Sequence, residues 1–174
     1  MGSEMCIRDS NNGATSQADV TITVTGTNDD PVAQIAANAA VEDGAVVSGT
    51  LTQTDDDTND THTYSLITNT SEGLADVSPN GDYTFDPGTG FQDLAFGETR
   101  DVTFTYEVED NNGATSQADV TIAITGTNDD PVSQIAANAA VEDGTVVSGT
   151  LTQTDDDTND THCLLYTSPS PRDS

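Results

Sequence analysis

The sequence predicts an all-β protein in which antiparallel β-sandwich domains follow one another in tandem. The first observation is alternation: DVTITVTG at 19–26 and DVTFTYEVED at 101–110 switch between apolar and polar residues, as half-buried strands do. The second is an internal repeat, because residues 11–62 recur as 111–162 with four differences in 52 positions. The period of 100 residues is the size of a sandwich with its own core, whereas solenoid repeats run about 20 to 50 residues.

The domain junction is expected in the segment GTNDDPV, where turn formers and a proline directly follow a strand-like run. We therefore expect the C-terminal strand of a preceding repeat at 11–30 and one complete repeat at 31–130. The N-terminal part of the next repeat would occupy 131–162. Both partial copies lack partners for their strands, so they should be frayed on their own.

Within the complete copy, short runs separated by turn signals predict seven strands, the number typical of an antiparallel sandwich. Asn80-Gly81 and Asn112-Gly113 are dipeptides that favour positive φ, and each is expected to close a hairpin. Residues 36–41 could instead begin a helical turn, which Gly44 would limit. The expected strands cover 32–41, 46–51, 62–68, 74–78, 82–86, 99–109 and 118–125.

Bulky side chains are scarce, so those present are interpreted as the core of the sandwich. The alternating residues Val102, Phe104, Tyr106 and Val108 would share one strand face. A sugar-stacking platform is the alternative use of the aromatic residues, but it would need them exposed on one face, and the chain has no tryptophan. The expected core comprises Tyr64, Leu66, Tyr83, Phe85, Phe91, Leu94, Phe104 and Tyr106.

The two ends of the chain differ in composition from the Asp/Thr/Gly-rich sequence between them. MCIRDS at 5–10 and CLLYTS at 163–168 can be written as one DNA word read on opposite strands, and that word resembles a transposon-end sequencing adapter. We therefore interpret residues 1–10 and 163–174 as adapter-derived, expect them to be disordered, and exclude them from fold reasoning. A short signal or tag at the start is the alternative, although no apolar h-region supports it.

The charge excludes several classes of partner. The chain has 31 acidic and 3 basic residues, for a net charge of −28, and without its ends it keeps Arg100 as the sole basic residue and no cysteine. A strongly negative surface repels nucleic acid and anionic membranes and attracts cations. We expect no nucleic-acid partner and no membrane insertion, since no apolar run reaches about 18 residues. High charge with few aromatics is also typical of disorder, but disordered tails lack the alternating pattern.

The run DDDTND at 55–60 indicates a cation site in the loop before the strand at 62–68. Five of its six side chains are carboxylates or amides, whose oxygens suit a hard divalent ion, and Ca²⁺ tolerates irregular geometry better than Mg²⁺ does. Zinc is not expected, because residues 11–162 contain no cysteine and each copy has one histidine. An EF-hand is rejected, because Asp60 and Leu66 replace its glycine and its bidentate glutamate. A merely solvated acidic loop is the alternative.

Further oxygen clusters lie in GTNDDPV and in VEDG, and together with T-D-x-D and with Y-x-V-x-D at 106–110 they resemble a known family. The set is similar to the VCBS and cadherin-like repeats of large bacterial adhesins, and the resemblance covers residues 11–162. It implies immunoglobulin/cadherin-like sandwiches with calcium bound between successive domains. It departs from the cadherin pattern in lacking the full D-x-N-D-N linker and any D-R-E triplet.

The resemblance implies a set of calcium ligands at each junction. The linker would supply an Asn-Asp pair, the following copy its D-x-D loop, and the preceding copy an acid of VEDG. Asp110 ends the Y-x-V-x-D motif and joins the set. The candidate metal ligands are Asn28, Asp29, Glu42, Asp55, Asp57, Asp110, Asn128, Asp129, Glu142, Asp155 and Asp157.

These observations predict a calcium-stiffened spacer repeat of an exported bacterial surface protein, with neighbouring repeats of the same chain as its main partners. It would support cell adhesion or biofilm attachment, and other domains of the parent could contact surface polysaccharide or host proteins. The alternatives are a carbohydrate- or protein-binding module of a secreted degradative enzyme, and an acidic rod without ion dependence. No enzyme is expected, because the sequence contains no G-x-S-x-G, H-E-x-x-H or glycine-rich phosphate loop.

Overall fold

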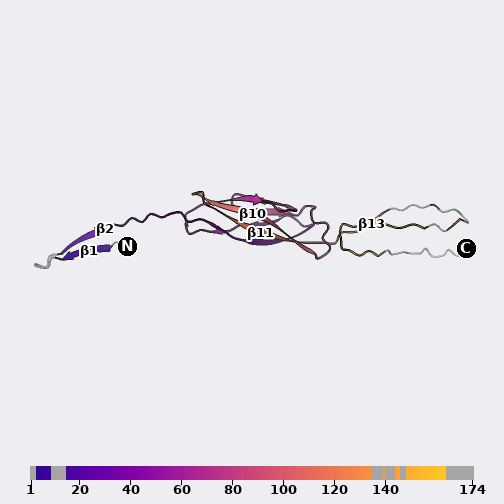
Figure 1. Cartoon of the computed structure of the whole chain (residues 1–174), viewed down its shortest axis with the longest axis horizontal. Coiled ribbons are helices and arrows are strands. Elements are labelled where there is room, and N and C mark those ends of the chain that lie inside the picture. The colour runs from indigo at the N-terminus through magenta and orange to yellow at the C-terminus, as the bar shows by residue number, and fades with distance from the viewer. Residues whose placement is uncertain (1–2, 9–14, 135–138, 140–143, 146–147, 164–174) are drawn as a thin grey trace.

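The computed structural model describes residues 3–8, 15–134, 139, 144–145 and 148–163. Every regular element in this part of the chain is a β-strand, so the all-β prediction is confirmed. No helix long and apolar enough to cross a membrane occurs among the same residues. The elements lie in a row, with a ribbon at each end and a sandwich between them (Figure 1).

Two sheets form the sandwich within residues 31–130, the central copy. The larger has the order β4 (Ala36–Val41), β11 (Thr115–Thr125), β10 (Thr99–Asp110) and β7 (His62–Thr68). The smaller has the order β5 (Val47–Thr50), β9 (Asp82–Asp86) and β8 (Leu74–Val77). A short ribbon joins β3 (Val32–Ala33) to β6 (Gln53–Thr54).

The structure divides the first expected strand and adds a short one, which makes nine strands in the described part of the central copy instead of seven. The run at 32–41 breaks at Gln34, whose backbone N–H bonds to the Tyr106 hydroxyl at 3.0 Å and to the Thr52 carbonyl at 3.1 Å. After the break the chain crosses to the larger sheet, where β4 pairs with β11 in parallel. The prediction of a purely antiparallel sandwich was therefore wrong at this one edge.

The core lies between the two sheets and consists of the residues that the alternation indicated. Val102, Phe104, Tyr106 and Val108 are at most 3% exposed. The ring of Tyr83 from the smaller sheet meets that of Phe104 at 5.4 Å and 60°, an edge-to-face contact. Six of the eight expected core residues are buried, and Tyr64 and Leu66 pack against them half-buried. The aromatic side chains among these eight thus form the core, as predicted, rather than a platform on the surface.

Two hairpins have the turns that the dipeptides predicted. Gly81 has φ +90° between β8 and β9, and Gly113 has φ +89° between β10 and β11. A residue with a Cβ would be strained in this left-handed region, whereas glycine enters it freely. The second hairpin matters for function, because it holds Asp110 at one end of the sandwich.

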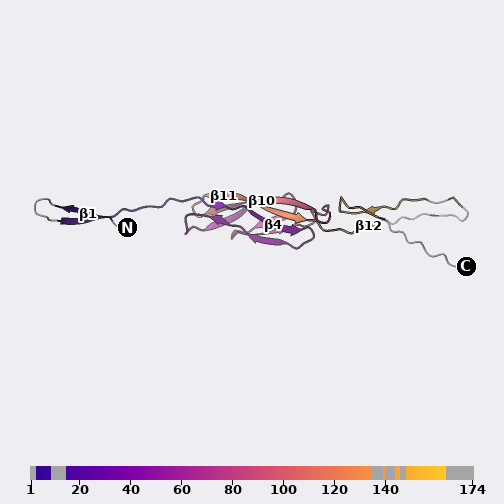
Figure 2. The same ribbon diagram turned by 90° about the horizontal axis from the view of Figure 1, so that it is seen from below.

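One short ribbon lies on each side of the sandwich. β1 (Ser3–Arg8) pairs antiparallel with β2 (Thr15–Val20), and an extended, exposed segment at 21–30 leads from β2 to the sandwich. Beyond the sandwich, β12 (Val132–Ser133) pairs with β13 (Gln153–Thr154). Figure 2 shows the same order along the axis from a second direction.

The first of these ribbons differs from the expectation. Residues 1–10 were expected to be disordered and 11–30 to form a terminal strand, whereas the structure pairs Ser3–Arg8 with Thr15–Val20 and has no strand at 21–31. Backbone pairing requires only an available edge, so a segment without its own domain pairs locally. The adapter origin of residues 1–10 and 163–174 stays a prediction.

Candidate metal sites at the ends of the sandwich

The short ribbon β3–β6 brings two acidic segments of the sequence together. It places the linker before Pro31 next to the turn that follows Thr54. The backbone N–H of Asp29 donates to Asp57 Oδ2 at 2.8 Å, and the N–H of Asp57 donates to Asp55 Oδ1 at 2.8 Å. The turn is thereby folded so that carboxylates of the linker and of the D-x-D loop share one side.

The same arrangement recurs 100 residues later in the chain. Asp129 N–H donates to Asp157 Oδ2 at 2.9 Å, and Asp157 N–H donates to Asp155 Oδ1 at 3.0 Å. The ribbon β12–β13 has the register of β3–β6, shifted by 100 residues. The half-site made of linker and turn is therefore specified by its own local sequence.

A histidine orients the first aspartate of each turn. Gln53 Nε2 lies 3.0 Å from His62 Nδ1, and His62 Nε2 lies 2.7 Å from Asp55 Oδ2, so the ring is hydrogen-bonded at both nitrogens. The hydrogen bond from His62 lowers the pKa of Asp55 and keeps its carboxylate charged. His162 makes the same contact with Asp155 at 2.5 Å and lowers the pKa of that carboxyl.

At the N-terminal end of the sandwich, the turn meets the hairpin between β10 and β11. Carboxylate oxygens of Asp55, Asp60 and Asp110 lie within 4.8 Å of one another and could hold a metal ion. Asp110 is 5% exposed, and its pKa is lowered mainly by the hydrogen bond from Asn28 Nδ2, at 2.8 Å. Asn112 adds donors from its side chain to Asp60 Oδ2, at 2.9 Å, and to Asn28 Oδ1.

At the C-terminal end, a second acidic cluster spans two copies of the repeat. Carboxylate oxygens of Glu42, Asp129 and Asp157 lie within 4.8 Å of one another. Glu42 is 1% exposed and Asp157 is 3% exposed. The Thr127 backbone N–H and hydroxyl donate to Glu42 Oε1, at 2.5 and 3.0 Å. The hydroxyl also donates to Asp43 Oδ2, at 3.3 Å.

One oxygen of each carboxylate in this second cluster is buried and has no hydrogen-bond partner among the described residues. These atoms are Glu42 Oε2, Asp129 Oδ2 and Asp157 Oδ1. Burial raises the pKa of Asp129, and the charges of Asp43, Asp157 and Glu42 raise it further. A buried carboxylate without a donor is costly unless a cation or proton compensates it, so the donor set fits a hard cation.

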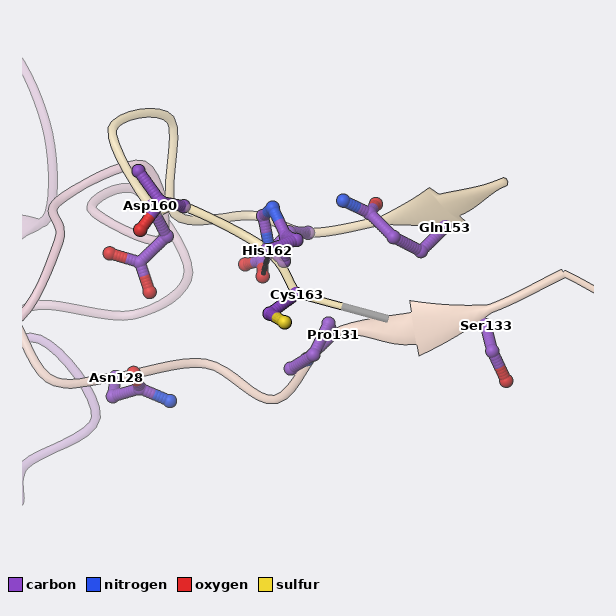
Figure 3. A pocket seen from close by; sticks show the side chains of 9 residues that line it. Asn128, Pro131, Ser133, Gln153, Asp160, His162 and Cys163 are labelled. Carbon is purple, nitrogen blue, oxygen red and sulfur yellow. Dashed lines mark hydrogen bonds and ion pairs between the residues drawn. The ribbon is translucent and has the colours of Figure 1, made fainter. Parts of the chain in front are cut away.

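An open cavity of about 360 Å³ lies beside the turn of the C-terminal copy. Figure 3 shows Asn128 and Pro131 on one side of it and Asp160 and His162 on the other. In the central copy, the equivalent of this space is closed by the β10–β11 hairpin, and Pro31 is fully buried there while Pro131 is exposed. The same linker and turn residues therefore have different surroundings in the two places.

The structure groups most of the predicted ligands in two sets, one at each end of the sandwich. Asn28, Asp29, Asp55, Asp57 and Asp110 gather at the N-terminal end. Glu42, Asp129, Asp155 and Asp157 gather at the C-terminal end.

Two predicted ligands stand outside this grouping. Asn128 lies beside the second cluster, but its exposed side chain donates to the Asp129 carbonyl at 2.9 Å. Glu142 lies outside the described residues.

Several site residues were not among the predicted ligands. Asp60 belongs to the first cluster, and its place in the DDDTND run was a usable signal. Asn112 and Thr127 orient ligands by hydrogen bonds, at 2.9 Å to Asp60 and 3.0 Å to Glu42. No short motif marks these contacts, because each joins segments more than 50 residues apart.

The described part of the chain thus contains a module of two packed β-sheets with an acidic cluster at each end, the second of them shared with residues of the following repeat. The family model described as bacterial cadherin-like domain matches residues 28–126, more than half of the chain. The chain belongs to this family. The matched range covers both hairpins and both Glu42 and Asp110, and it ends at the linker.

Cadherin ectodomains are among the solved structures to which the chain is similar. A protocadherin gamma B7 fragment with extracellular cadherin domains 1–4 has a TM-score of 0.50 at 18% identity, over 90% of this chain and 48% of that one. Drosophila N-cadherin EC1–4 has a TM-score of 0.46 at 18% identity, over 74% of this chain and 33% of that one. The chain thus spans about half the length of the first. At this identity the likeness concerns the fold alone, and no curated protein matches the sequence.

Proposed function

We propose that this chain is part of a calcium-stiffened rod, a non-catalytic spacer repeat of an exported bacterial adhesin-like protein. The observation that supports it most directly is the trio of buried, unpartnered oxygens of Glu42, Asp129 and Asp157. Two of these residues belong to one copy and the third to the next. A cation bound by all three would join consecutive copies and lock their relative orientation.

In this proposal, the two ends of the central copy correspond to the two sides of one junction. At the C-terminal end, Asp157 in the turn of the next copy lies near Glu42. At the N-terminal end, Asp55 and Asp60 in the repeat-equivalent turn lie near Asp110 of their own copy. A complete junction would combine both sides around one turn. The ligands would then be Glu42, Asp129, Asp155, Asp157, Asp160 and the repeat-equivalent of Asp110.

Calcium suits these residues better than other ions. Irregular sets of six to eight oxygen ligands are typical of Ca²⁺, and extracellular modules bind it with Kd values of roughly 0.1 to 1 mM. Such affinities would leave the sites empty at cytosolic calcium and filled outside the cell. The rod would thus stiffen only after export, which is compatible with repeats that contain no cysteine between residues 11 and 162.

Thermal melting of the full chain in EGTA and in 10 mM CaCl₂ tests the calcium proposal. At 10 to 100 times Kd, binding to the folded state adds about 1.4 to 2.7 kcal/mol. The midpoint should rise by several degrees, since about 1 kcal/mol shifts Tm by roughly 4 to 8 °C in domains of this size. Magnesium chloride at equal ionic strength is the control. Equal midpoints in EGTA and calcium would remove calcium from the proposal.

Surface display requires a separate experiment. Antibodies raised against this chain should label intact source cells, because a spacer of an adhesin lies outside the membrane. Labelling that appears only after lysis would contradict the proposal. A binding module is the second class, and saturable retention of the chain on polysaccharides would favour it.

A further inference from the structure

The loop Gln92–Glu98, here called the shelf, lies at the C-terminal end of the sandwich beside the second acidic cluster. Its own domain holds it firmly: Leu94 N–H donates to the Phe91 carbonyl at 2.9 Å, and Glu98 N–H to the Ala95 carbonyl at 2.8 Å. Arg100 donates to both oxygens of Asp93, at 3.1 and 2.7 Å. The shelf is therefore a preformed surface.

The shelf is also tied to the linker and to the cluster. Gly97 N–H donates to the Gly126 carbonyl at 3.1 Å, and Gly126 N–H donates to the Glu98 carbonyl at 2.8 Å. A Cβ added at Gly126 would lie 2.4 Å from the Leu94 carbonyl oxygen, so the linker can start here only as glycine. Gln92 Nε2 donates to Asp43 Oδ1 at 3.0 Å.

The turn Asp157–Asp160 of the next copy, here called the docked turn, rests on this surface. Thr158 Oγ1 donates to the Asp93 carbonyl at 3.2 Å, and Asn159 Nδ2 donates to Glu98 Oε1 at 2.8 Å. Asp157 itself is 3% exposed. Its neighbours in sequence thus contact protein groups of the preceding copy while its carboxylate faces the cluster.

An identical turn in the same chain lacks this support. Residues 52–62 and 152–162 have the same sequence, and both turns make the same internal bonds. Among the described residues nothing bonds the side chains of Thr58 and Asn59, and Asp57 is only half-buried. Since the local sequence is equal, the extra burial of Asp157 comes from the preceding copy.

We propose that the shelf is a docking surface for the following repeat that acts without any ion. The shelf fits a turn in which a threonine hydroxyl and the amide of the next residue, an asparagine, act as donors. Thr158 and Asn159 of the following copy are such a pair. Docking brings Asp157 to Glu42 and Asp129 before a cation arrives, so that less ordering remains to be done on binding. The inference uses the tandem arrangement of the proposed function but does not depend on calcium.

The test compares Asn159→Ala with Asn59→Ala in the full chain by ¹H–¹⁵N NMR in EGTA. The two substitutions are the same change in the same local sequence, and only position 159 has a shelf. Asn159→Ala should shift the backbone amide signals of residues 93–98 and accelerate hydrogen exchange in the docked turn. Asn59→Ala should leave the shelf signals unchanged. Unchanged shelf signals in Asn159→Ala, or equal shifts in both variants, would overturn the proposal.

A second pair of variants acts from the other side of the contact. Gly126→Ala must displace the shelf, because its Cβ has no room, whereas a Cβ at Gly26 meets nothing within 4 Å. In EGTA, Gly126→Ala should release the docked turn to the exchange rates of residues 57–60, and Gly26→Ala should not. Retained protection in Gly126→Ala contradicts docking. If docking is seen but calcium leaves the melting midpoint unchanged, the shelf stands and the calcium proposal fails.

Discussion

The carboxylates of Glu42 and Asp157 lie within 4.8 Å of each other, although they belong to consecutive copies of the repeat. Glu42 follows β4 of the central copy, and Asp157 sits in the turn after β13. Both are buried, and each has one oxygen without a hydrogen-bond donor. The contact joins two consecutive copies of the repeat and supplies oxygen ligands for the proposed cation.

Replacing Glu42 by Gln should weaken calcium binding at the second cluster by about tenfold or more, because one ligand charge is lost. The amide oxygen still accepts from Thr127, so the fold should persist. Calorimetric titration of the full chain with calcium measures the effect. Glu107→Gln is the matched control, since Glu107 lies away from both clusters and bonds to Gln117. Equal affinities in the two variants would exclude Glu42 as a ligand.

Lowering the pH should stabilise the C-terminal cluster, which contains Asp129, and destabilise the N-terminal cluster, which contains Asp55 and Asp110. The pKa of Asp129 is raised above its ordinary value of 3.8, so the folded state favours the protonated form. In EGTA, the C-terminal junction should therefore gain stability as pH falls through this raised pKa. The pKa values of Asp55 and Asp110 are lowered, so their contribution is complete above 3.8 and is lost as pH falls below it.

In the presence of calcium, the C-terminal junction should instead lose stability as the pH falls, because protons compete with the ion for Asp129. Calcium affinity should fall as pH drops through its raised pKa, and binding should release protons in that range. Calorimetry in two buffers with different ionisation enthalpies measures the released protons. An affinity that does not change across this range would show that Asp129 is not a ligand.

Replacing Tyr106 by Phe should destabilise the sandwich by about 1 to 3 kcal/mol. Its buried hydroxyl lies 2.7 Å from the Gln34 carbonyl and 3.0 Å from the Thr52 carbonyl, and it accepts from Gln34 N–H. These bonds hold the break between β3 and β4. Urea denaturation measures the loss, and Tyr64→Phe, at a half-buried ring, should cost less. A larger loss in the control would contradict this role.

Replacing Ile122 by Ala should cost roughly 2 to 5 kcal/mol, since it empties a fully buried position of β11. The same substitution at Ile22 should change stability by less than about 0.5 kcal/mol, because that side chain is 76% exposed. Both residues stand in the sequence DVTI. Denaturation of the two variants side by side measures the difference, and similar losses would mean that residues 19–22 are buried in solution.

The sequence predicted the fold more completely than the site. Alternation identified the buried face of β10, and the two Asn-Gly dipeptides identified hairpins. It could not predict the parallel pairing of β4 with β11, because that depends on the Tyr106 hydroxyl interrupting the first strand. It singled out Asp55 and Asp57 from their crowding, but the roles of Thr127 and Asn112 depend on contacts that only the folded chain creates.

The sequence alone indicated which segments can alternate as strands, and it placed the two Asn-Gly turns. Each linker also folds against the D-x-D turn that follows it wherever these residues recur, since the bond from Asp29 to Asp57 is repeated from Asp129 to Asp157. The tertiary structure decided which of two repeated sequence segments is buried. Ile22 is exposed and Ile122 is not, because only β11 has β10 and β4 as neighbours. Burial and ligand pairing depend on what lies across the sheet or the junction, and identical residues cannot encode that difference.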